Sequence, residues 1–522
     1  MLTTDQVTQK ETQNLFRLLD REQKGEISNA VFWQNLERQG ITPTDPRLQG
    51  AIQPPMSREI PRDIDESQFH EILQQNALIK KALSKQLAIP EFERFCKILT
   101  EIFEDTKKNK SGKVADYIPQ LARMNPEHYA MSICTVDGQR FSIGDSDKLF
   151  CLQSSCKPIN YLLALDEMGT SDVHRHVGRE PSGVSFNELT LNSRGLPHNP
   201  MINSGAIMSC SLIGRDLDLS EKFDKVQQAW SQLCGNAPVY FNNSVFLSER
   251  QTADRNFALA YFMRENNAFP PDTNLLETLE FYFQCCAIES NTHDLSVAAA
   301  TLANAGTNPL TGEALYKPST VKNCLSLMLS CGMYDFSGEF AFKIGLPAKS
   351  GVSGVLMLVI PNLMGITIWS PRLDRHGNTV RGVEFCERLT ETFSFHHYDS
   401  LRGNTQKINP RQAISVTKTA QMVQAIWAAS MGDLDELILL QSEGLDLNIA
   451  DYDGRTPLHL AASENHVEIV QYLIDSGVDL APKDRWGGTP SEDAKRHGHQ
   501  KVVDLLSKHL KSENGKPAPS NP

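Results

Sequence analysis

The sequence of 522 residues has no long hydrophobic run and no surplus of positive charge. A helix that spans a membrane needs about 20 consecutive apolar residues. The most apolar window, residues 355–369, is interrupted by Pro361, Asn362 and Gly365, and it predicts two core strands instead. The formal net charge is −12, whereas nucleic acids and anionic membranes favour a basic surface. We therefore expect neither a nucleic acid nor a membrane as a partner.

Targeting and disulfide signals are lacking as well. The first 16 residues contain Asp5 and Glu11 but no apolar segment, so they resemble neither a secretory signal nor an arginine-rich transit peptide. The 11 cysteines have no regular spacing, which is typical of reduced thiols inside the cell. No Cys/His group has the spacing of a zinc site, and we expect no metal and no cofactor. The expected location is the cytoplasm, or the mitochondrion if the N-terminus is processed or truncated.

The N-terminal region has helical apolar spacing on both sides of the polar run DREQKGEIS. This run resembles an EF-hand loop, with Asp20 at the first position and Gly25 at the sixth. Lys24 and Val31 occupy positions five and twelve, where a calcium loop needs oxygen ligands. We therefore predict that residues 1–105 form a helical, EF-hand-like domain without a competent calcium loop.

The middle of the chain combines strand and helix signals. Residues 131–135 and 140–143 flank Asp137-Gly138, which is a strong hairpin signal. A second strand pair is predicted at 355–360 and 364–369, and long helical patterns lie between the two pairs. The sequence therefore predicts one α/β domain over 106–402, whose sheet joins the two ends of the segment.

The C-terminal part contains a repeat of 33 residues. Thr456-Pro457-Leu458-His459 recurs as Thr489-Pro490, and Asp451 recurs as Asp484. This period and the TPLH motif are the signature of ankyrin repeats. We predict ankyrin repeats over 424–510, with a protein partner on their surface, a linker at 403–423 and a disordered tail at 511–522.

Ser154 and Lys157 form an S-x-x-K motif at the start of a helical pattern that ends at Gly169. Pro158 suits only the first turn of a helix, which predicts that Ser154 lies at or near the helix N-terminus. Residues three apart share one face of a helix. The pair is a candidate nucleophile and general base. Taken alone, the motif is better explained as an N-cap serine and a solvated lysine.

A second motif, Lys349-Ser350-Gly351, precedes the predicted strand at 355–360. A lysine and a hydroxyl on an edge strand, followed by glycine, can bind a substrate carboxylate and supply an oxyanion-hole N–H. The order S-x-x-K and then K-S-G is the layout of serine β-lactamases and penicillin-binding proteins. Their middle motif is absent, and Tyr334 is the nearest candidate for it. We predict a multidomain protein whose α/β catalytic domain has this β-lactamase-like fold, between an all-α N-terminal domain and an ankyrin-repeat domain.

Seven segments between 112 and 354 resemble the serine-dependent glutaminases. They are GKVADYIPQLA, CTVDGQR, EPSGVSFNEL, HNPMINSGAI, SERQTADRNFALAY, SCGMYDFSGEFAF and GLPAKSGVSG. The order of a helical EF-hand-like region, this domain and ankyrin repeats resembles the long, animal-type members of the family. The resemblance implies hydrolysis of L-glutamine to L-glutamate and ammonia, and a homo-oligomer, either a dimer or a tetramer.

The resemblance also implies roles for particular residues. Ser154 would attack the side-chain amide, Lys157 would take its proton as general base, and Tyr334 would relay the proton to the departing ammonia. The backbone N–H groups of Ser154 and Val352 would form the oxyanion hole. The remaining matched positions would bind the substrate: Tyr117, Asn203, Glu249, Asn256 and Tyr282.

Two departures from the family pattern leave questions open. Val355 replaces a common glycine near the oxyanion hole, and Thr190 stands where an aromatic residue is common in the gating loop 183–195. Phosphate activation and filament formation therefore stay open. The alternatives are another serine acyl-transfer hydrolase of β-lactamase type and an ankyrin scaffold with an inactive enzyme domain. Glu249 and Asn256 favour an amino-acid substrate.

Overall fold

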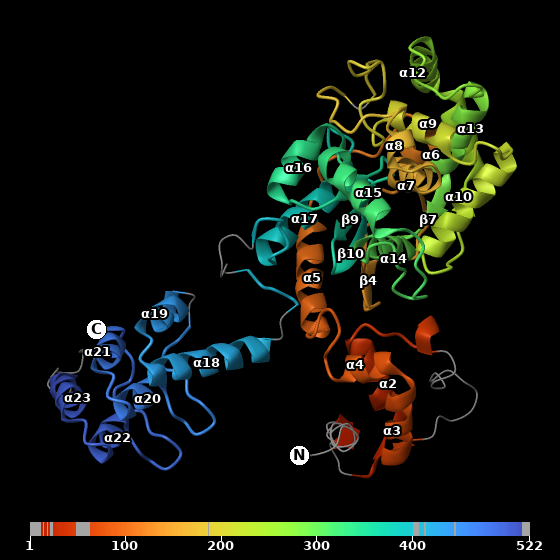
Figure 1. The fold of residues 1–522 in the computed structure, drawn as a ribbon. Helices are drawn as coiled ribbons and strands as arrows, with labels where there is room; N and C mark the ends of the chain where they lie inside the picture. Colours follow the sequence, from red (N-terminus) through yellow and green to blue (C-terminus); the bar gives the residue numbers. More distant parts are fainter. Residues whose placement is uncertain are drawn as a thin grey trace. The chain divides into compact units, whose positions relative to one another are not determined.

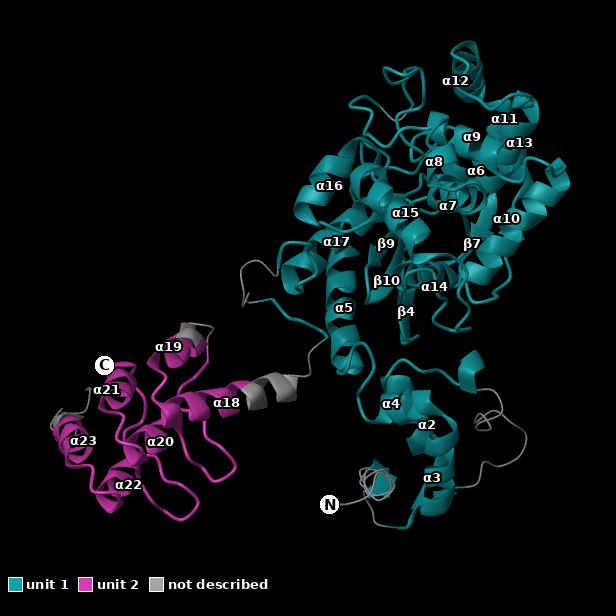
Figure 2. Ribbon diagram, viewed as in Figure 1, with its two compact units in different colours: residues 1–411 teal, residues 412–522 magenta. Residues whose placement is uncertain are grey.

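The computed structural model of the chain describes residues 12–513, except for 14, 18, 21–23, 49–62, 186, 400–406, 412–413 and 443–444. The chain divides into two compact units, residues 1–411 and 412–522 (Figures 1 and 2). Each unit has its own hydrophobic core. The candidate catalytic residues all belong to the first unit.

The first unit is built around an antiparallel sheet of five strands in the order β4-β3-β10-β9-β8. The second predicted strand pair is confirmed at its exact bounds, and the first pair is confirmed with one extra residue at the start of β3 and one at the end of β4. The strands are β3 (Ala130–Thr135), β4 (Arg140–Gly144), β8 (Ala348–Ser350), β9 (Val355–Ile360) and β10 (Met364–Trp369). The sheet thus joins the two ends of the segment, as the sequence predicts.

Both faces of this sheet are buried, which explains the continuous apolar run in β9. Val355 and Met357 face one core, and Leu356 and Leu358 face the other, because successive side chains of a strand point to opposite faces. Helix α14 (Thr292–Ala303) packs on β10, β3 and β9. A β-carbon on Gly365 would lie 2.3 Å from the Ala300 nitrogen, so only glycine permits this close approach.

Helices cover the sheet on both faces (Figure 1). On one face, α5 (Phe92–Thr106) and α17 (Val380–Thr392) pack on the sheet together with α16 (Ser337–Lys343). On the other face, α14 leads into a helical layer. This layer contains α7 (Lys157–Met168), α9 (Asn203–Leu212), α10 (Leu219–Leu233), α12 (Asp254–Glu265), α13 (Leu275–Cys286) and α15 (Pro318–Cys331). Shorter helices complete the unit: α6 (Pro119–Ala122), α8 (Thr170–Val173) and α11 (Asn243–Gln251).

The N-terminal part of the first unit contains α2 (Asn29–Arg38), α3 (Glu66–Gln75) and α4 (Ala77–Leu83). Two short strands, β1 (Glu26–Ile27) and β2 (Ile64–Asp65), pair antiparallel beside them. The carboxylate of Asp20 accepts hydrogen bonds from the backbone N–H groups of Lys24 and Gly25, at 2.9 and 2.8 Å. Backbone N–H groups of the loop itself therefore provide the hydrogen-bond partners of its first acidic residue.

Residues that flank the N-terminal helices make hydrogen bonds to the β3–β4 turn. The Arg47 guanidinium donates to the carbonyl oxygens of Asp137 (2.6 Å) and Pro309 (3.1 Å), and it pairs with the buried Asp45 at 2.7 Å. Gln139 is fully buried, and its amide donates to the carbonyl oxygens of Gln39 and Ile89 at 3.0 and 3.1 Å. These bonds tie the N-terminal helices to the sheet.

The second unit is a stack of three helix pairs, as the 33-residue period predicts. The pairs are α18 (Ile414–Met431) with α19 (Leu434–Ser442), α20 (Pro457–Ser463) with α21 (Val467–Asp475), and α22 (Pro490–Arg496) with α23 (Gln500–Glu513). Thr456 and Thr489 both cap their helices, and each is followed by proline in the first turn. Two expectations need correction. The predicted linker 403–423 contains the start of α18, and α23 continues three residues into the predicted tail.

Candidate active site

Ser154 lies in a short turn between a strand and a helix. Strand β5 (Phe150–Cys151) belongs to a second sheet of order β5-β7-β6, with β7 at Ile288–Ser290 and β6 at Tyr240–Phe241. The 3₁₀ turn η2 (Gln153–Cys156) follows, and α7 begins at Lys157. The sequence places Ser154 at the N-terminus of an α-helix. The structure places it one tight turn earlier, which continues directly into that helix.

Lys157 is fully buried at the start of α7. Its Nζ donates a hydrogen bond of 2.6 Å to Oδ1 of Asn203. Burial lowers the pKa of Lys157 from 10.5 to about 8, because the interior disfavours the charged ammonium. A lysine that must act as a base needs such a neutral amine.

Tyr334 lies in the 3₁₀ turn η3 (Tyr334–Phe336), which follows α15. Burial raises the pKa of the Tyr334 phenol, and the neighbouring Ser154 side chain partly opposes that rise. The backbone of Tyr334 has φ of 52°, a left-handed conformation that costs a non-glycine residue about 1–3 kcal/mol. Ser337 stabilises this turn, because its hydroxyl donates to the Tyr334 carbonyl oxygen at 2.7 Å. Such strain is characteristic of functional sites.

Asn203, the first residue of α9, is the centre of a group of polar side chains. Its Oδ1 accepts from Lys157 and, at 3.4 Å, from the Tyr282 hydroxyl. Its Nδ2 donates to Oδ1 of Asn187 (3.1 Å) and of Asn256 (3.3 Å). The structure therefore brings together three of the residues predicted to bind the substrate, directly against the candidate base.

Glu249, near the end of α11, forms a second group. Its Oε1 accepts hydrogen bonds from the Tyr117 hydroxyl at 2.6 Å and from Nε2 of Gln153 at 3.0 Å. Burial raises the pKa of the Glu249 carboxyl, and these two hydrogen bonds and the nearby Lys157 oppose that rise. A nearly buried carboxyl group at this place can be a partner for a substrate ammonium group.

The segment after β8 approaches the nucleophile turn closely. A β-carbon on Gly351 would lie 2.8 Å from the Leu152 carbonyl oxygen, so the glycine of K-S-G allows the two backbones to meet. A β-carbon on Gly377 would lie 3.7 Å from both Val352 and Tyr334, so both side chains border Gly377. The side chain of Val355 is fully buried in the core at the start of β9, and its carbonyl accepts from the Gly351 N–H at 2.9 Å. The valine that replaces the common glycine at this position therefore packs into the core.

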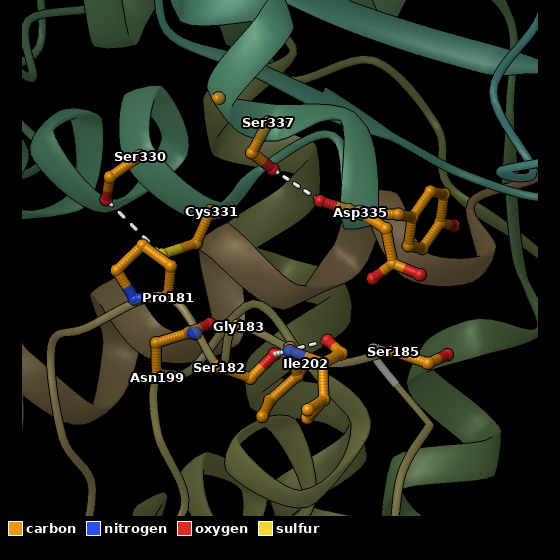
Figure 3. Close-up of a pocket in the computed structure, with 13 residues that line it drawn as sticks. Pro181, Ser182, Gly183, Ser185, Asn199, Ile202, Ser330, Cys331, Asp335 and Ser337 are labelled. Carbon is orange, nitrogen blue, oxygen red and sulfur yellow. Dashed lines mark hydrogen bonds between the residues drawn. The ribbon is translucent and has the colours of Figure 1, made fainter.

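A cavity of about 470 Å³ opens beside Tyr334. Figure 3 shows Pro181, Ser182 and Gly183 on one side of it and Ser330 and Asp335 on the other. The first side belongs to the predicted gating loop 183–195 and the residues just before it. Phe186 of this loop is outside the described residues.

The structure shows the surroundings of the K-S-G lysine and adds two residues to the site. Lys349, which this motif would allow to bind a substrate carboxylate, is fully buried, and its Nζ donates to two backbone carbonyl oxygens. Gln153 and Asn187 join the groups around Glu249 and Asn203. A left-handed φ of 50° at Gln153 marks it as unusual, and neither residue carries a sequence signal that would have identified it.

The eleven cysteines are all buried as free thiols. Within the described part of the chain there is no cluster of His, Cys, Asp and Glu that could hold a metal ion. The same part contains no helix long and apolar enough to cross a membrane.

Comparison with protein families gives three matches along the chain. The glutaminase family model matches residues 112–398, and the ankyrin-repeat model (three copies) matches 425–516. An EF-hand domain model matches 11–90. The predicted multidomain fold class and its β-lactamase-like catalytic domain are confirmed.

Known proteins agree with these matches. The mouse mitochondrial liver isoform of glutaminase is 44% identical over 91% of this chain and 80% of its own length. A glutaminase of Nostoc is 45% identical over 59% of this chain and 92% of its own length. A solved structure named "Probable glutaminase ybaS" is 33% identical with a TM-score of 0.55, and it covers 57% of this chain and 96% of that protein. The chain therefore belongs to the glutaminase family of amidohydrolases.

Proposed function

We propose that the protein hydrolyses L-glutamine to L-glutamate and ammonia through a glutamyl ester on Ser154. The observation that carries this proposal is the trio of Ser154, Lys157 and Tyr334. A buried lysine with a pKa of about 8 lies one turn after the serine, and the Tyr334 phenol is close enough to the serine for the serine to affect its pKa. A serine becomes nucleophilic only when an adjacent base can take its proton.

The first half of the reaction forms the ester. Ser154 Oγ attacks the side-chain amide carbon, and its proton passes to the neutral amine of Lys157. The negative charge on the carbonyl oxygen is stabilised by the backbone N–H groups of Ser154 and Val352. The C–N bond then breaks as Tyr334 relays the proton from Lys157 to the leaving nitrogen, which departs as ammonia. The relay leaves the Tyr334 phenol protonated and the Lys157 amine neutral again.

The second half hydrolyses the ester. A water molecule attacks the same carbon while Lys157 accepts the water's proton, and Ser154 leaves with that proton as glutamate forms. The same base thus serves both halves, so no cofactor is needed to balance the reaction.

The two polar groups around the trio account for the choice of an amino-acid substrate. Glu249 binds the α-ammonium group, with Tyr117 at the edge of the pocket. Asn203, Asn256 and Tyr282 offer neutral hydrogen-bonding groups for the α-carboxylate. A β-lactam has no α-ammonium requirement of this kind, so Glu249 favours glutamine over the β-lactamase alternative.

The direct test is turnover by the purified full chain. We expect ammonia and glutamate from glutamine and no product from asparagine. Ser154→Ala should lower kcat by at least about 10³-fold, because it removes the covalent nucleophile. Residual turnover within tenfold of the wild type would mean that another residue attacks the amide. Hydrolysis of nitrocefin without glutamine turnover would favour the β-lactamase-type alternative, and an intact fold with neither activity would favour the scaffold alternative.

The chain's assembly and location are proposals as well. We propose a homo-oligomer, either a dimer or a tetramer, with a protein partner on the ankyrin repeats. Size-exclusion chromatography with light scattering, with and without phosphate, tests the oligomer and any response to phosphate. The proposed compartment is the cytoplasm, or the mitochondrion if the N-terminus is processed, and fractionation of cells that express the full chain tests it.

A further inference from the structure

Lys349 has an environment that the predicted role in substrate binding does not explain. It lies on β8, the edge strand of the five-stranded sheet, and it is fully buried. Its Nζ donates to the carbonyl oxygen of Ser350 at 2.6 Å and to that of Gly332 at 3.1 Å. The same nitrogen lies over the Tyr334 ring, 4.5 Å from its centroid.

These contacts use the hydrogen-bonding capacity of the side chain. A lysine ammonium has three N–H donors, and the neutral amine has two. Two of them point to backbone carbonyls, and the nitrogen faces an aromatic ring. Burial, and then the nearby Lys157, lower the pKa of Lys349 well below its usual value. A buried group arranged in this way is poorly placed to bind a substrate carboxylate.

Gly332 connects Lys349 to the backbone of Tyr334. It is the C-cap residue of α15, two residues before Tyr334, and its carbonyl oxygen also accepts from the Ser350 N–H at 3.2 Å. A β-carbon on Gly332 would lie 1.8 Å from the Ala348 carbonyl oxygen, so the end of α15 rests directly on β8. Lys349 thus contacts Tyr334 in two ways. It donates a hydrogen bond to the segment just before Tyr334, and its amine packs on the face of the Tyr334 ring.

Tyr334 needs such support because its backbone is strained. With φ of 52° it adopts a conformation that a tyrosine leaves unless the surroundings fix it. Ser337 fixes its carbonyl oxygen from the C-terminal side, and Asn378 Nδ2 donates to the Met333 carbonyl oxygen at 3.3 Å. Lys349 is the contact that reaches both the ring and the preceding turn.

We propose that Lys349 is a positioning residue that holds the Tyr334 phenol against Ser154, and that it does not bind the substrate carboxylate. This inference rests on the proposed function, in which Tyr334 passes a proton to the leaving nitrogen. A ring that turns away from Ser154 would leave substrate binding intact and slow the chemical step.

A double-mutant cycle on the full chain tests the proposal. The four proteins are the wild type, Lys349→Met, Tyr334→Phe and the double variant. Lys349→Met should lower kcat by about 10–100-fold and leave KM for glutamine within about twofold, because only transition-state interactions are lost. In the Tyr334→Phe background the same change should cost less than about threefold, since the phenol it serves is already gone.

Two results would overturn the inference. A higher KM with an unchanged kcat would make Lys349 a substrate ligand, and losses that multiply in the double variant would make its role independent of Tyr334. Lys343→Met is the matched control, because this lysine is exposed at the end of α16 and pairs with Glu339 and Glu387. If Lys349→Met does not fold, Lys349→Gln keeps two N–H donors and replaces it in the same cycle.

A second measurement does not depend on turnover. 3-Fluorotyrosine placed at position 334 should change its ¹⁹F resonance in Lys349→Met and keep it in Lys343→Met. An unchanged resonance in Lys349→Met would overturn the inference even in an active enzyme. A wild type that does not hydrolyse glutamine would instead overturn the proposed function, and the ¹⁹F comparison would still decide the role of Lys349.

Discussion

Replacing Lys157 by methionine should make the protein inactive and more stable. The unfolded chain keeps the usual lysine pKa of 10.5, whereas burial lowers the pKa in the folded state to about 8. Between these values the unfolded state binds more protons, so the free energy of unfolding rises with pH across that window. Below pH 8 burial of the charged Lys157 lowers the free energy of unfolding of the wild type by its full amount. This amount is about 3 kcal/mol at 1.36 kcal/mol per pKa unit.

Methionine removes this cost because it is uncharged and of similar shape. It also removes the hydrogen bond to Asn203, which is worth about 1 kcal/mol. Lys157→Met should therefore gain about 2 kcal/mol at pH 7. The gain should fall close to zero at about pH 9.5, where the unfolded wild type has begun to lose its proton.

Urea denaturation at several pH values, followed by the fluorescence of the buried Trp230 and Trp369, measures these differences. Lys343→Met serves as the control, because Glu387 and Glu339 raise the pKa of Lys343 above 10.5, so its effect on stability should not vary between pH 7 and 9.5. In the wild type, kcat/KM should rise with pH around an apparent pKa of about 8, as the amine of Lys157 becomes neutral. This account of Lys157 would be refuted if Lys157→Met were less stable than the wild type at pH 7. It would also be refuted if the difference in free energy of unfolding between the two proteins did not change with pH.

The remaining predictions concern the substrate ammonium, the N-terminal helices and calcium. Glu249→Gln should raise KM for glutamine by roughly 10–100-fold, because the charged partner of the α-ammonium is lost; steady-state kinetics with an unchanged KM would contradict this. Arg47→Ala should lower the free energy of unfolding by about 2 kcal/mol, since the buried Asp45 loses its partner at 2.7 Å and keeps Arg140 at 3.8 Å. KM should stay within twofold, and an unchanged urea midpoint would contradict this prediction. Calcium at about 1 mM should give no saturable heat in titration calorimetry, because Asp20 is occupied by backbone N–H groups and Lys24 replaces a ligand.

Much of the sheet can be predicted because its signals are local. Asp137-Gly138 specifies the first turn, and the interruption at Pro361-Asn362 separates two runs that are buried on both faces. The start of the catalytic helix is predicted to within three residues, since Pro158 restricts it to a first turn. The tight 3₁₀ turn that carries Ser154 has no comparable local signal.

The environment of each site residue depends on partners that are far away in the sequence. Gln153 and Glu249 are joined across 96 positions, and no spacing rule connects them. For Lys349 the sequence does carry a motif, but the motif does not predict its contacts. Its motif matches a substrate-binding pattern, but the end of α15 packs on β8 and buries the amine. A motif therefore identified the position of the lysine in the site, and only the packing determined what it touches.

The bonds between the N-terminal helices and the β3–β4 turn also have a consequence for synthesis of the chain on the ribosome. Strand β3 pairs with β10, which follows it by about 230 residues, so at roughly 5–20 residues per second β10 is made about 10–50 s later. The segments beside the N-terminal helices that carry Arg47 and supply the Gln39 and Ile89 carbonyls are made before the hairpin. During that interval the β3–β4 hairpin can place its turn against the N-terminal residues that bind it. The central strand of the sheet, β10, has not yet been made.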